Sequence, residues 1–243
     1  MRIFGFIPAR YDSVRFPGKP IARIAGKPMI QHVYECALSC PEFSEVWVAT
    51  DDKRISESVS AFGGRSVITD KSHRSGTDRI REAAIKLGLE NEDLVVNIQG
   101  DQPIFNPSII SLLVKPLLEN TQIQMTTLKY RITDENDIQN PNHVKVVTDR
   151  NGFALYFSRS PIPYFRDVNS TRIFYKHLGL YGFRMEFLKQ YTKLSEGDLE
   201  YIEKLEQLRA LEHGFKIKVL ESPFDSIEVD VPEDILKIEE AIG

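Results

Sequence analysis

The stretch IFGFIPARYDSVRFPGKP, residues 3–20, decides the predicted fold. Residues 3–8 form a continuous apolar run of strand length, which is typical of a parallel strand buried on both faces. The chain then changes at once to a polar, basic loop. In sheets of parallel strands, ligands bind beyond the carboxyl ends of the strands. We therefore expect this loop to belong to a binding site at the end of the first strand.

Alternating strands and helices follow this stretch. Apolar residues at helical spacing predict helices over 29–38, 55–62, 80–87 and 107–118, and β-forming runs predict strands over 45–50, 66–69 and 93–98. Such repeats favour a parallel sheet with right-handed crossovers, which is a Rossmann-like α/β fold. The polar segment Gln99-Gly100-Asp101 follows one of these strands, so we expect it on the same side as the first loop.

The pattern changes after about residue 122. Mostly β-like segments at 123–130, 143–149, 153–158 and 177–184 suggest antiparallel strands joined to the parallel sheet. Further on we expect a helix over 198–213, with Ile202, Leu205, Leu208 and Leu211 in its apolar stripe, a strand over 216–221 and a helix over 232–242. We expect one domain over residues 1–243, with a core at 1–122 and 214–243 and a β-rich insertion at about 123–213.

Composition excludes several classes of protein. The 243 residues are 42% hydrophobic and 27% charged, which is ordinary for a globular protein. The balance of 31 basic and 35 acidic residues gives a net charge of −4, which argues against a nucleic-acid partner. We also expect no membrane span, no signal peptide and no disulfide from Cys36 and Cys40, and hence a cytoplasmic protein.

The first loop is basic in an otherwise acidic chain. Between residues 10 and 27, five cations face one acid, Asp12: Arg10, Arg15, Lys19, Arg23 and Lys27. Charge-assisted donors of this kind suit phosphate oxygens, and Gly18 allows a close approach of the backbone. The loop lacks the spacing of a P-loop. A bound triphosphate explains it, while a solvated basic surface loop is the alternative.

Two carboxylates are candidate metal ligands. Asp101 follows a buried strand, and alternation over 227–231 predicts a short strand that places Glu228 and Asp230 on one face. Two carboxylates together with phosphate oxygens and water form the usual Mg²⁺ site. The alternative for Asp101 is the capping of a turn. Glu233 and Asp234 are interpreted as first-turn acids of the last helix.

Eleven segments, in order along nearly the whole chain, resemble those of bacterial CMP-Kdo synthetases, the 3-deoxy-manno-octulosonate cytidylyltransferases. They are IPARY (7–11), RFPGKP (15–20), IAGKPMI (24–30), VATD (48–51), SGTDR (75–79), NIQGD (97–101), VKVV (144–147), ALYFSR (154–159), KHLGLY (176–181), LEQLR (205–209) and VDVPED (229–234). The first segments are shared by many nucleotidyltransferases, whereas those around 157–159, 177–181 and 205–209 are far more specific.

The resemblance implies that CTP and Kdo are converted to CMP-Kdo and pyrophosphate for lipopolysaccharide biosynthesis, with Mg²⁺, on a Rossmann-like nucleotidyltransferase fold and in a homodimer. It implies that the core binds nucleotide and that the β-rich insertion carries acceptor and dimer contacts. Nucleotide would contact Ala9, Arg10, Ser13, Arg15, Lys19, Ser75, Gly76, Thr77 and Gln99. The sugar acid would contact Arg159, His177, Tyr181, Glu206 and Gln207. Lys19, Arg15, Asp101 and Asp230 would carry the chemistry, the two aspartates as Mg²⁺ ligands.

Several alternatives stay open at this point. Gln102 stands where family members commonly have Glu, and an 8-amino-Kdo branch of the family shares this Gln, so the C8 substituent of the acceptor is undecided. Another sugar nucleotidyltransferase and a non-catalytic nucleotide sensor are further alternatives. Arg159 has the alternative of a surface ion pair, and the pair His177 and Tyr181 that of core packing. Glu206 and Gln207 suit the solvated face of a helix equally well.

Overall fold

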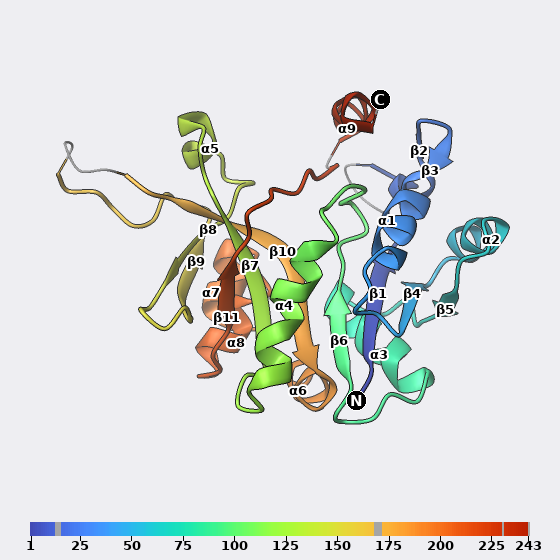
Figure 1. Ribbon diagram of the computed structural model, residues 1–243, viewed down its shortest axis with the longest axis horizontal. Coiled ribbons are helices and arrows are strands. Elements are labelled where there is room, and N and C mark those ends of the chain that lie inside the picture. The colour runs from blue at the N-terminus through green and yellow to red at the C-terminus, as the bar shows by residue number, and fades with distance from the viewer. Residues whose placement is uncertain (13–15, 168–171, 230, 243) are drawn as a thin grey trace.

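A nine-stranded sheet forms the centre of the protein (Figure 1). The computed structural model describes residues 1–12, 16–167, 172–229 and 231–242. Four strands, β1 (Ile3–Ala9), β4 (Glu45–Thr50), β5 (Ser66–Ile68) and β6 (Leu94–Asn97), pair in parallel in the order β6-β1-β4-β5. The predicted Rossmann-like, mostly parallel sheet is confirmed.

The sheet continues into the second half of the chain without a break. Strand β10 (Tyr175–Arg184) pairs antiparallel with β6 on one side and with β7 (Met125–Arg131) on the other, and β11 (Lys218–Glu221) pairs in parallel with β7. Because β10 is antiparallel to both neighbours, β7 and β11 run in the same direction as β1. A smaller ladder of β8 (Lys145–Thr148) and β9 (Ala154–Ser158) attaches to β10 through Lys145 and Lys176.

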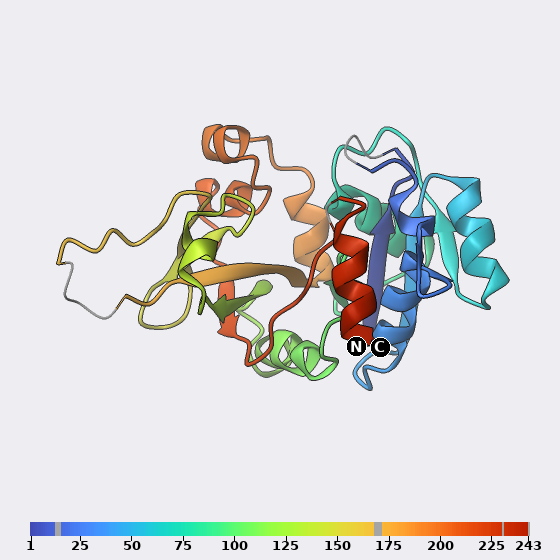
Figure 2. The ribbon, with the colours of Figure 1, turned by 90° about the horizontal axis from the view of Figure 1, so that it is seen from above.

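Helices cover both faces of the sheet (Figures 1 and 2). One apolar cluster joins α1 (Met29–Leu38), α2 (Lys53–Ala61) and α4 (Ser108–Glu119) to the sheet, and the other joins α3 (Gly76–Lys86), α6 (Met185–Tyr191) and α8 (Leu208–Glu212) to it. The side chains of β1 alternate between them, since Phe4 and Phe6 belong to the second cluster and Ile7 and Ala9 to the first. The sheet is therefore buried on both faces, as its apolar strands require.

The shorter elements lie around this centre. They are the 3₁₀ helix η1 (Lys19–Ile21), the hairpin strands β2 (Arg23–Ile24) and β3 (Lys27–Pro28), α5 (Glu135–Gln139), α7 (Asp198–Glu203) and α9 (Asp234–Ile242). Among the described residues, no helix is long and apolar enough to cross a membrane.

The prediction of one helix over 198–213 is wrong. The chain forms α7 and α8 with a break between them, where Lys204 has a left-handed conformation with φ of 53°. Arg209 of α8 turns back to Glu200 of α7, with a Nε–Oε2 distance of 2.7 Å, so the two short helices are clamped across the break. Ile202, expected in the apolar stripe, is 73% exposed as a result.

The strand expected over 227–231 is also absent from the described part of that stretch. Ile227 makes a single antiparallel bridge with Ile104, and no strand continues through Val229. The backbone N–H of Val229 instead donates to the carbonyl of Asp101, at 2.9 Å, because the segment packs against the loop after β6. The last helix begins at Asp234, two residues beyond Pro232.

Candidate active site

Two adjoining cavities lie at the carboxyl ends of β1 and β6. The smaller, of about 270 Å³, is lined by Pro8, Ala9, Arg10, Asp12, Lys19, Pro20, Gln99, Gly100 and Asp101, and we call it the basic cavity. The larger, of about 720 Å³, is lined by Gln99, Asp101, Asn142, Val144, Arg159, His177, Gly179, Tyr181, Lys204, Leu205, Glu206, Gln207 and Glu228, and we call it the acceptor cavity. Gln99 and Asp101 line both, so these two residues mark where the cavities meet.

Lys19 connects three segments at this junction. Its Nζ donates to Asp101 Oδ2 and to the backbone carbonyl of Val229, at 2.8 Å each. The helical turn that presents it follows Gly18, whose φ of +74° favours glycine and whose N–H donates to the carbonyl of Tyr11. The first loop, the end of β6 and the C-terminal segment are thus held together by one ammonium group.

The basic cavity contains part of the predicted triphosphate site. Ala9 and Arg10 line it beside Lys19, whereas the predicted residues Ser13 and Arg15 lie outside the described residues. Burial lowers the pKa of Arg10, with a further contribution from the nearby Arg79. Among the described residues, Arg10 Nη2 has no hydrogen-bond partner although it is buried. A buried, unpaired guanidinium nitrogen is costly, so this geometry favours a bound anion.

The predicted segment Ser75-Gly76-Thr77 forms the start of α3. Ser75 Oγ accepts from the N–H of Asp78 as the helix cap, at 3.0 Å, and Gly76 packs so closely on Pro8 that a Cβ atom there would lie 3.1 Å from its ring. Thr77 Oγ1 donates to Glu206 Oε2 at 3.0 Å. Gly76 therefore packs against the end of β1, and Thr77 contacts Glu206, which lines the acceptor cavity.

All five predicted acceptor residues line one cavity. They come from the end of β9 (Arg159), from β10 (His177 and Tyr181) and from the break between α7 and α8 (Glu206 and Gln207). The break explains how the last two leave the solvated helix face that periodicity suggested. Among the described residues, Glu206 Oε1 and Gln207 Nε2 are buried without a partner, which favours a polar ligand.

The guanidinium group of Arg159 connects segments that form the wall of the acceptor cavity. Nε donates to the carbonyl of Glu203 at 2.7 Å and Nη1 to that of Pro141 at 2.9 Å, and the backbone N–H of Arg159 donates to Glu203 Oε2. The predicted bidentate contact with an acceptor carboxylate must therefore use the N–H groups that these bonds leave over. Arg159 is thus a structural link between β9 and the α7–α8 break as well as a candidate ligand.

Burial changes the titration of three groups in the acceptor cavity. It lowers the pKa of His177 to about 3 and raises the pKa of Glu206 to about 7. It also raises the pKa of Tyr181 well above the usual range. His177 and Tyr181 are therefore neutral at pH 7, and their rings contact each other at 5.3 Å between centroids. His177 and Tyr181 thus offer uncharged hydrogen-bonding groups beside the charged lining residues Asp101, Arg159, Lys204 and Glu228. This mixture suits a ligand that carries both hydroxyl groups and a carboxylate.

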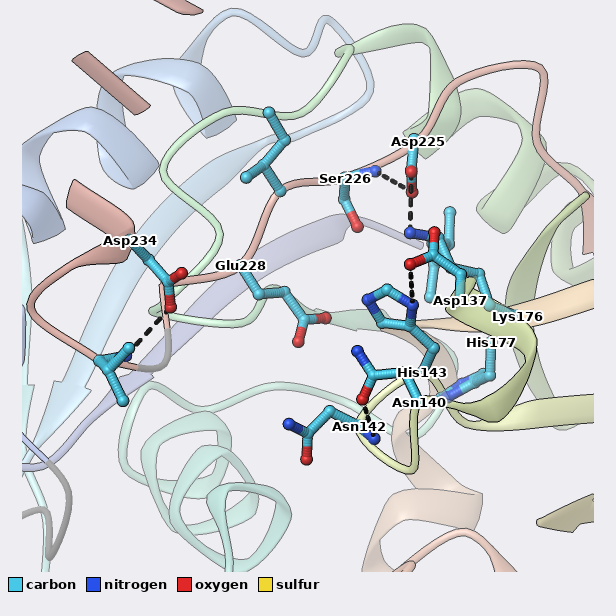
Figure 3. A pocket seen from close by; sticks show the side chains of 13 residues that line it. Asp137, Asn140, Asn142, His143, Lys176, His177, Asp225, Ser226, Glu228 and Asp234 are labelled. Carbon is cyan, nitrogen blue, oxygen red and sulfur yellow. Dashed lines mark hydrogen bonds and ion pairs between the residues drawn. The ribbon is translucent and has the colours of Figure 1, made fainter. Parts of the chain in front are cut away.

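A third cavity, of about 490 Å³, continues from the acceptor cavity, with which it shares Asn142, His177 and Glu228 (Figure 3). Most of its other lining residues are Asp137, Asn140, His143, Lys176, Asp225, Ser226 and Asp234, and sequence reasoning missed all of them as site residues. Gln102 Nε2 donates to Glu228 Oε1 at 2.8 Å. The sequence signals for this cavity were the turn-forming segment Asn140-Pro141-Asn142 and the stretch from Phe224 to Glu228, which resembles the 8-amino-Kdo branch of the family.

One carboxylate of the predicted metal pair is described. Asp101 stands at the junction of the cavities with its side chain 30% exposed, and Asp230 lies outside the described residues. No group of three or more His, Cys, Asp or Glu side chains that could hold a metal ion occurs within the described ranges. A partly exposed carboxylate beside the basic cavity fits Mg²⁺, because this ion is commonly bound by one or two carboxylates together with substrate phosphates and water.

The raised pKa of Glu206 predicts how a Glu206→Gln variant depends on pH. The folded protein holds this proton more tightly than the unfolded chain, whose carboxyl has the ordinary pKa of 4.5, so the wild type loses stability as pH rises through about 7. The glutamine variant lacks this loss. We expect its free energy of unfolding, relative to wild type, to rise between pH 5 and pH 8, by at most about 3 kcal/mol. Urea unfolding measures it, and equal differences at both pH values would contradict the assignment.

Comparison with known proteins places this site in a family. The family model described as Cytidylyltransferase matches residues 4–218. A 3-deoxy-manno-octulosonate cytidylyltransferase of Syntrophus aciditrophicus is 52% identical over 241 residues, covering 99% of this chain and 97% of the relative. An 8-amino-3,8-dideoxy-manno-octulosonate cytidylyltransferase of Shewanella loihica is 53% identical over 236 residues, covering 97% and 96%.

A solved structure agrees with these relatives. The structure of a CMP:2-keto-3-deoxy-manno-octonic acid synthetase complexed with CTP superposes with a TM-score of 0.93 at 40% identity, covering 100% of this chain and 98% of the other. The resemblance that the sequence motifs indicated is confirmed. The chain therefore belongs to the cytidylyltransferase family.

Proposed function

We propose that this protein activates Kdo, 3-deoxy-manno-octulosonate, with CTP, giving CMP-Kdo and pyrophosphate for lipopolysaccharide biosynthesis. The observation that carries the proposal is that the basic cavity and the acceptor cavity meet at Asp101 and Gln99. The relatives at about 50% identity and the CTP-bound neighbour support the same donor and acceptor. A non-catalytic sensor has no need of a second cavity beside the nucleotide.

The reaction requires in-line attack of the anomeric hydroxyl on the α-phosphorus of CTP, with pyrophosphate leaving. Transfer of this kind depends mostly on positioning and on stabilising charge. Lys19 and Arg10 in the basic cavity neutralise the charge that builds on the leaving pyrophosphate. His177, Tyr181 and Gln207 offer hydrogen-bond partners to the sugar hydroxyls. Arg159 contributes its remaining N–H groups to the acceptor carboxylate.

Mg²⁺ is part of the proposal, held by Asp101 and Asp230. When bound, it supplies positive charge for the α-phosphate and lowers the pKa of the attacking hydroxyl. The support from this chain is the position of Asp101 on the lining of both cavities. Lys19, which pairs with Asp101 at 2.8 Å, keeps the carboxylate in place at this junction.

We further propose that the enzyme is a homodimer in the cytoplasm. The support is an arm, leading away from β9, on which Tyr164 is 89% exposed, together with Leu155 on β9 itself, which is 63% exposed (Figure 2). Large apolar side chains that are this exposed suit burial against a second copy of the chain. Both cysteines, Cys36 and Cys40, are free thiols, which suits a reducing compartment. Sedimentation equilibrium measures the oligomeric state.

An 8-amino-Kdo acceptor is the second candidate, and one observation favours it. The third cavity carries four carboxylates, Asp137, Asp225, Glu228 and Asp234, against the cation Lys176, while burial lowers the pKa of His143 and favours its neutral form. Surplus negative charge beside the acceptor cavity suits an ammonium group at the far end of the sugar. The relative from Shewanella loihica, at 53% identity, bears the name of this activity.

A pyrophosphate-release assay that crosses CTP, UTP, ATP and GTP with Kdo, 8-amino-Kdo and a sialic acid tests the proposal. We expect turnover with CTP and Kdo, with the highest kcat/KM in that pair. A higher kcat/KM with 8-amino-Kdo would establish the second candidate instead. Turnover only with another nucleotide or with the sialic acid would contradict both.

The position of Asp101 predicts the effect of Asp101→Asn. The substitution keeps the shape of the side chain but removes the charge that Lys19 and Mg²⁺ require, so kcat should fall by about 100-fold or more. Asp70→Asn, in an exposed turn that lines none of the three cavities, is the control and should keep full activity. If both variants unfold at the same temperature as the wild type, the loss of activity reflects catalysis and not folding. Undiminished pyrophosphate release by Asp101→Asn would overturn the role of this carboxylate.

A further inference from the structure

Thr127 on β7 takes no part in the reaction proposed above, yet it is fully buried and makes three short polar contacts. Its Oγ1 lies 2.8 Å from His177 Nε2, 2.8 Å from the carbonyl of Leu180 and 3.2 Å from the carbonyl of Leu178. All three partners belong to β10, the strand that carries two acceptor residues. A single hydroxyl group thus connects a buried strand to the wall of the acceptor cavity.

The contacts lie where the pairing of β10 with β7 is interrupted. Leu178 pairs with Leu128 and Tyr181 with Thr127, so two residues of β10, Gly179 and Leu180, are left over as a bulge. Bulges turn side chains away from their regular directions and are common next to active sites. Here the bulge separates His177 from Tyr181. The carbonyl of Gly179 accepts from Gln99 Nε2 at 2.8 Å, so the bulge is held from the nucleotide side as well.

The three contacts determine the tautomer of His177. A hydroxyl has one proton, and Thr127 Oγ1 must donate it to a carbonyl, because two oxygens 2.8 Å apart without a proton between them repel each other. Oγ1 then has only lone pairs to offer His177. Nε2 of His177 must therefore carry a proton and donate it to Oγ1. In a neutral ring, the other nitrogen, Nδ1, is left as an acceptor.

The ring of His177 is also fixed in orientation. Phe157 packs edge-on against it at 5.1 Å between centroids, and the ring of Tyr181 contacts it at 5.3 Å. The backbone N–H of His177 donates to the carbonyl of Val144 at 2.7 Å. Turning the ring over would replace Nε2 by a carbon atom at Thr127 and leave the threonine lone pairs unpaired.

We propose that Thr127 is a positioning residue that fixes His177 as the neutral Nε2–H tautomer, so that Nδ1 accepts a hydrogen bond from a hydroxyl group of the sugar-acid acceptor. His177 lines both the acceptor cavity and the third cavity, so its ring borders the space that an acceptor would occupy (Figure 3). The inference rests on the proposed function, because it assigns the hydroxyl to the acceptor.

Thr127→Val, Thr127→Ser and Thr126→Val test the inference by kinetics. Thr126 is the matched control, since it is equally buried but points to the other face of the sheet, where Oγ1 donates to the carbonyl of Leu113 at 2.8 Å. We expect Thr127→Val to raise the KM for the acceptor about tenfold, with little change in the KM for CTP. Thr127→Ser should restore the acceptor KM, and Thr126→Val should leave it unchanged.

The tautomer is measured without turnover by NMR of protein labelled with ¹⁵N in histidine, with the His177 signals assigned by their loss in His177→Gln. We expect a protonated Nε2 and an unprotonated Nδ1 in the wild type and in Thr127→Ser, and a change of this pattern in Thr127→Val. A protonated Nδ1 in the wild type would overturn the proposal. So would equal acceptor KM values for Thr127→Val and wild type. Absence of pyrophosphate release by the wild type would instead contradict the proposed function, and the NMR result would still decide the tautomer.

Discussion

The site depends on one ammonium group, that of Lys19, which binds Asp101 Oδ2 and the carbonyl of Val229 at 2.8 Å each. These partners belong to segments more than a hundred residues apart. An ammonium group with 14% exposure of its side chain is stable only with such charged and polar partners. The first loop, the end of β6 and the C-terminal segment consequently come together at the point where the basic and acceptor cavities meet. The same ammonium group lines the basic cavity, where a phosphate can contact it. Lys19 therefore serves both the structure of the site and its proposed function.

The parallel half of the protein was predictable from the sequence because its signals are local. A buried parallel strand such as β1 is a continuous apolar run, and the polar residues that follow it, Arg10 among them, reach the carboxyl edge by topology alone. The position of Asp101 after β6 follows from the same rule. These predictions needed no knowledge of contacts between distant residues.

The acceptor side was less predictable because its form depends on contacts between distant residues. Helical spacing over 198–213 gave no sign of the break at Lys204, which depends on the pair of Arg209 with Glu200 and on the bonds from Arg159 to the carbonyl of Glu203. Glu206 therefore lies in a cavity and not on a solvated helix face. The bulge in β10, on which the arrangement of His177 depends, has one sign in the sequence, Gly179 inside the strand. The contacts that hold it, from Thr127 and Gln99, again come from distant residues.

The proposed site is tested most directly by a crystal structure of the protein with a non-hydrolysable CTP analogue, Mg²⁺ and Kdo. We expect the triphosphate in the basic cavity against Arg10 and Lys19, and the sugar acid in the acceptor cavity against His177 and Glu206. We also expect the α-phosphate and the anomeric hydroxyl to meet beside Asp101. Either ligand bound away from these cavities, or the two bound with Asp101 remote from both reacting groups, would contradict the proposed site.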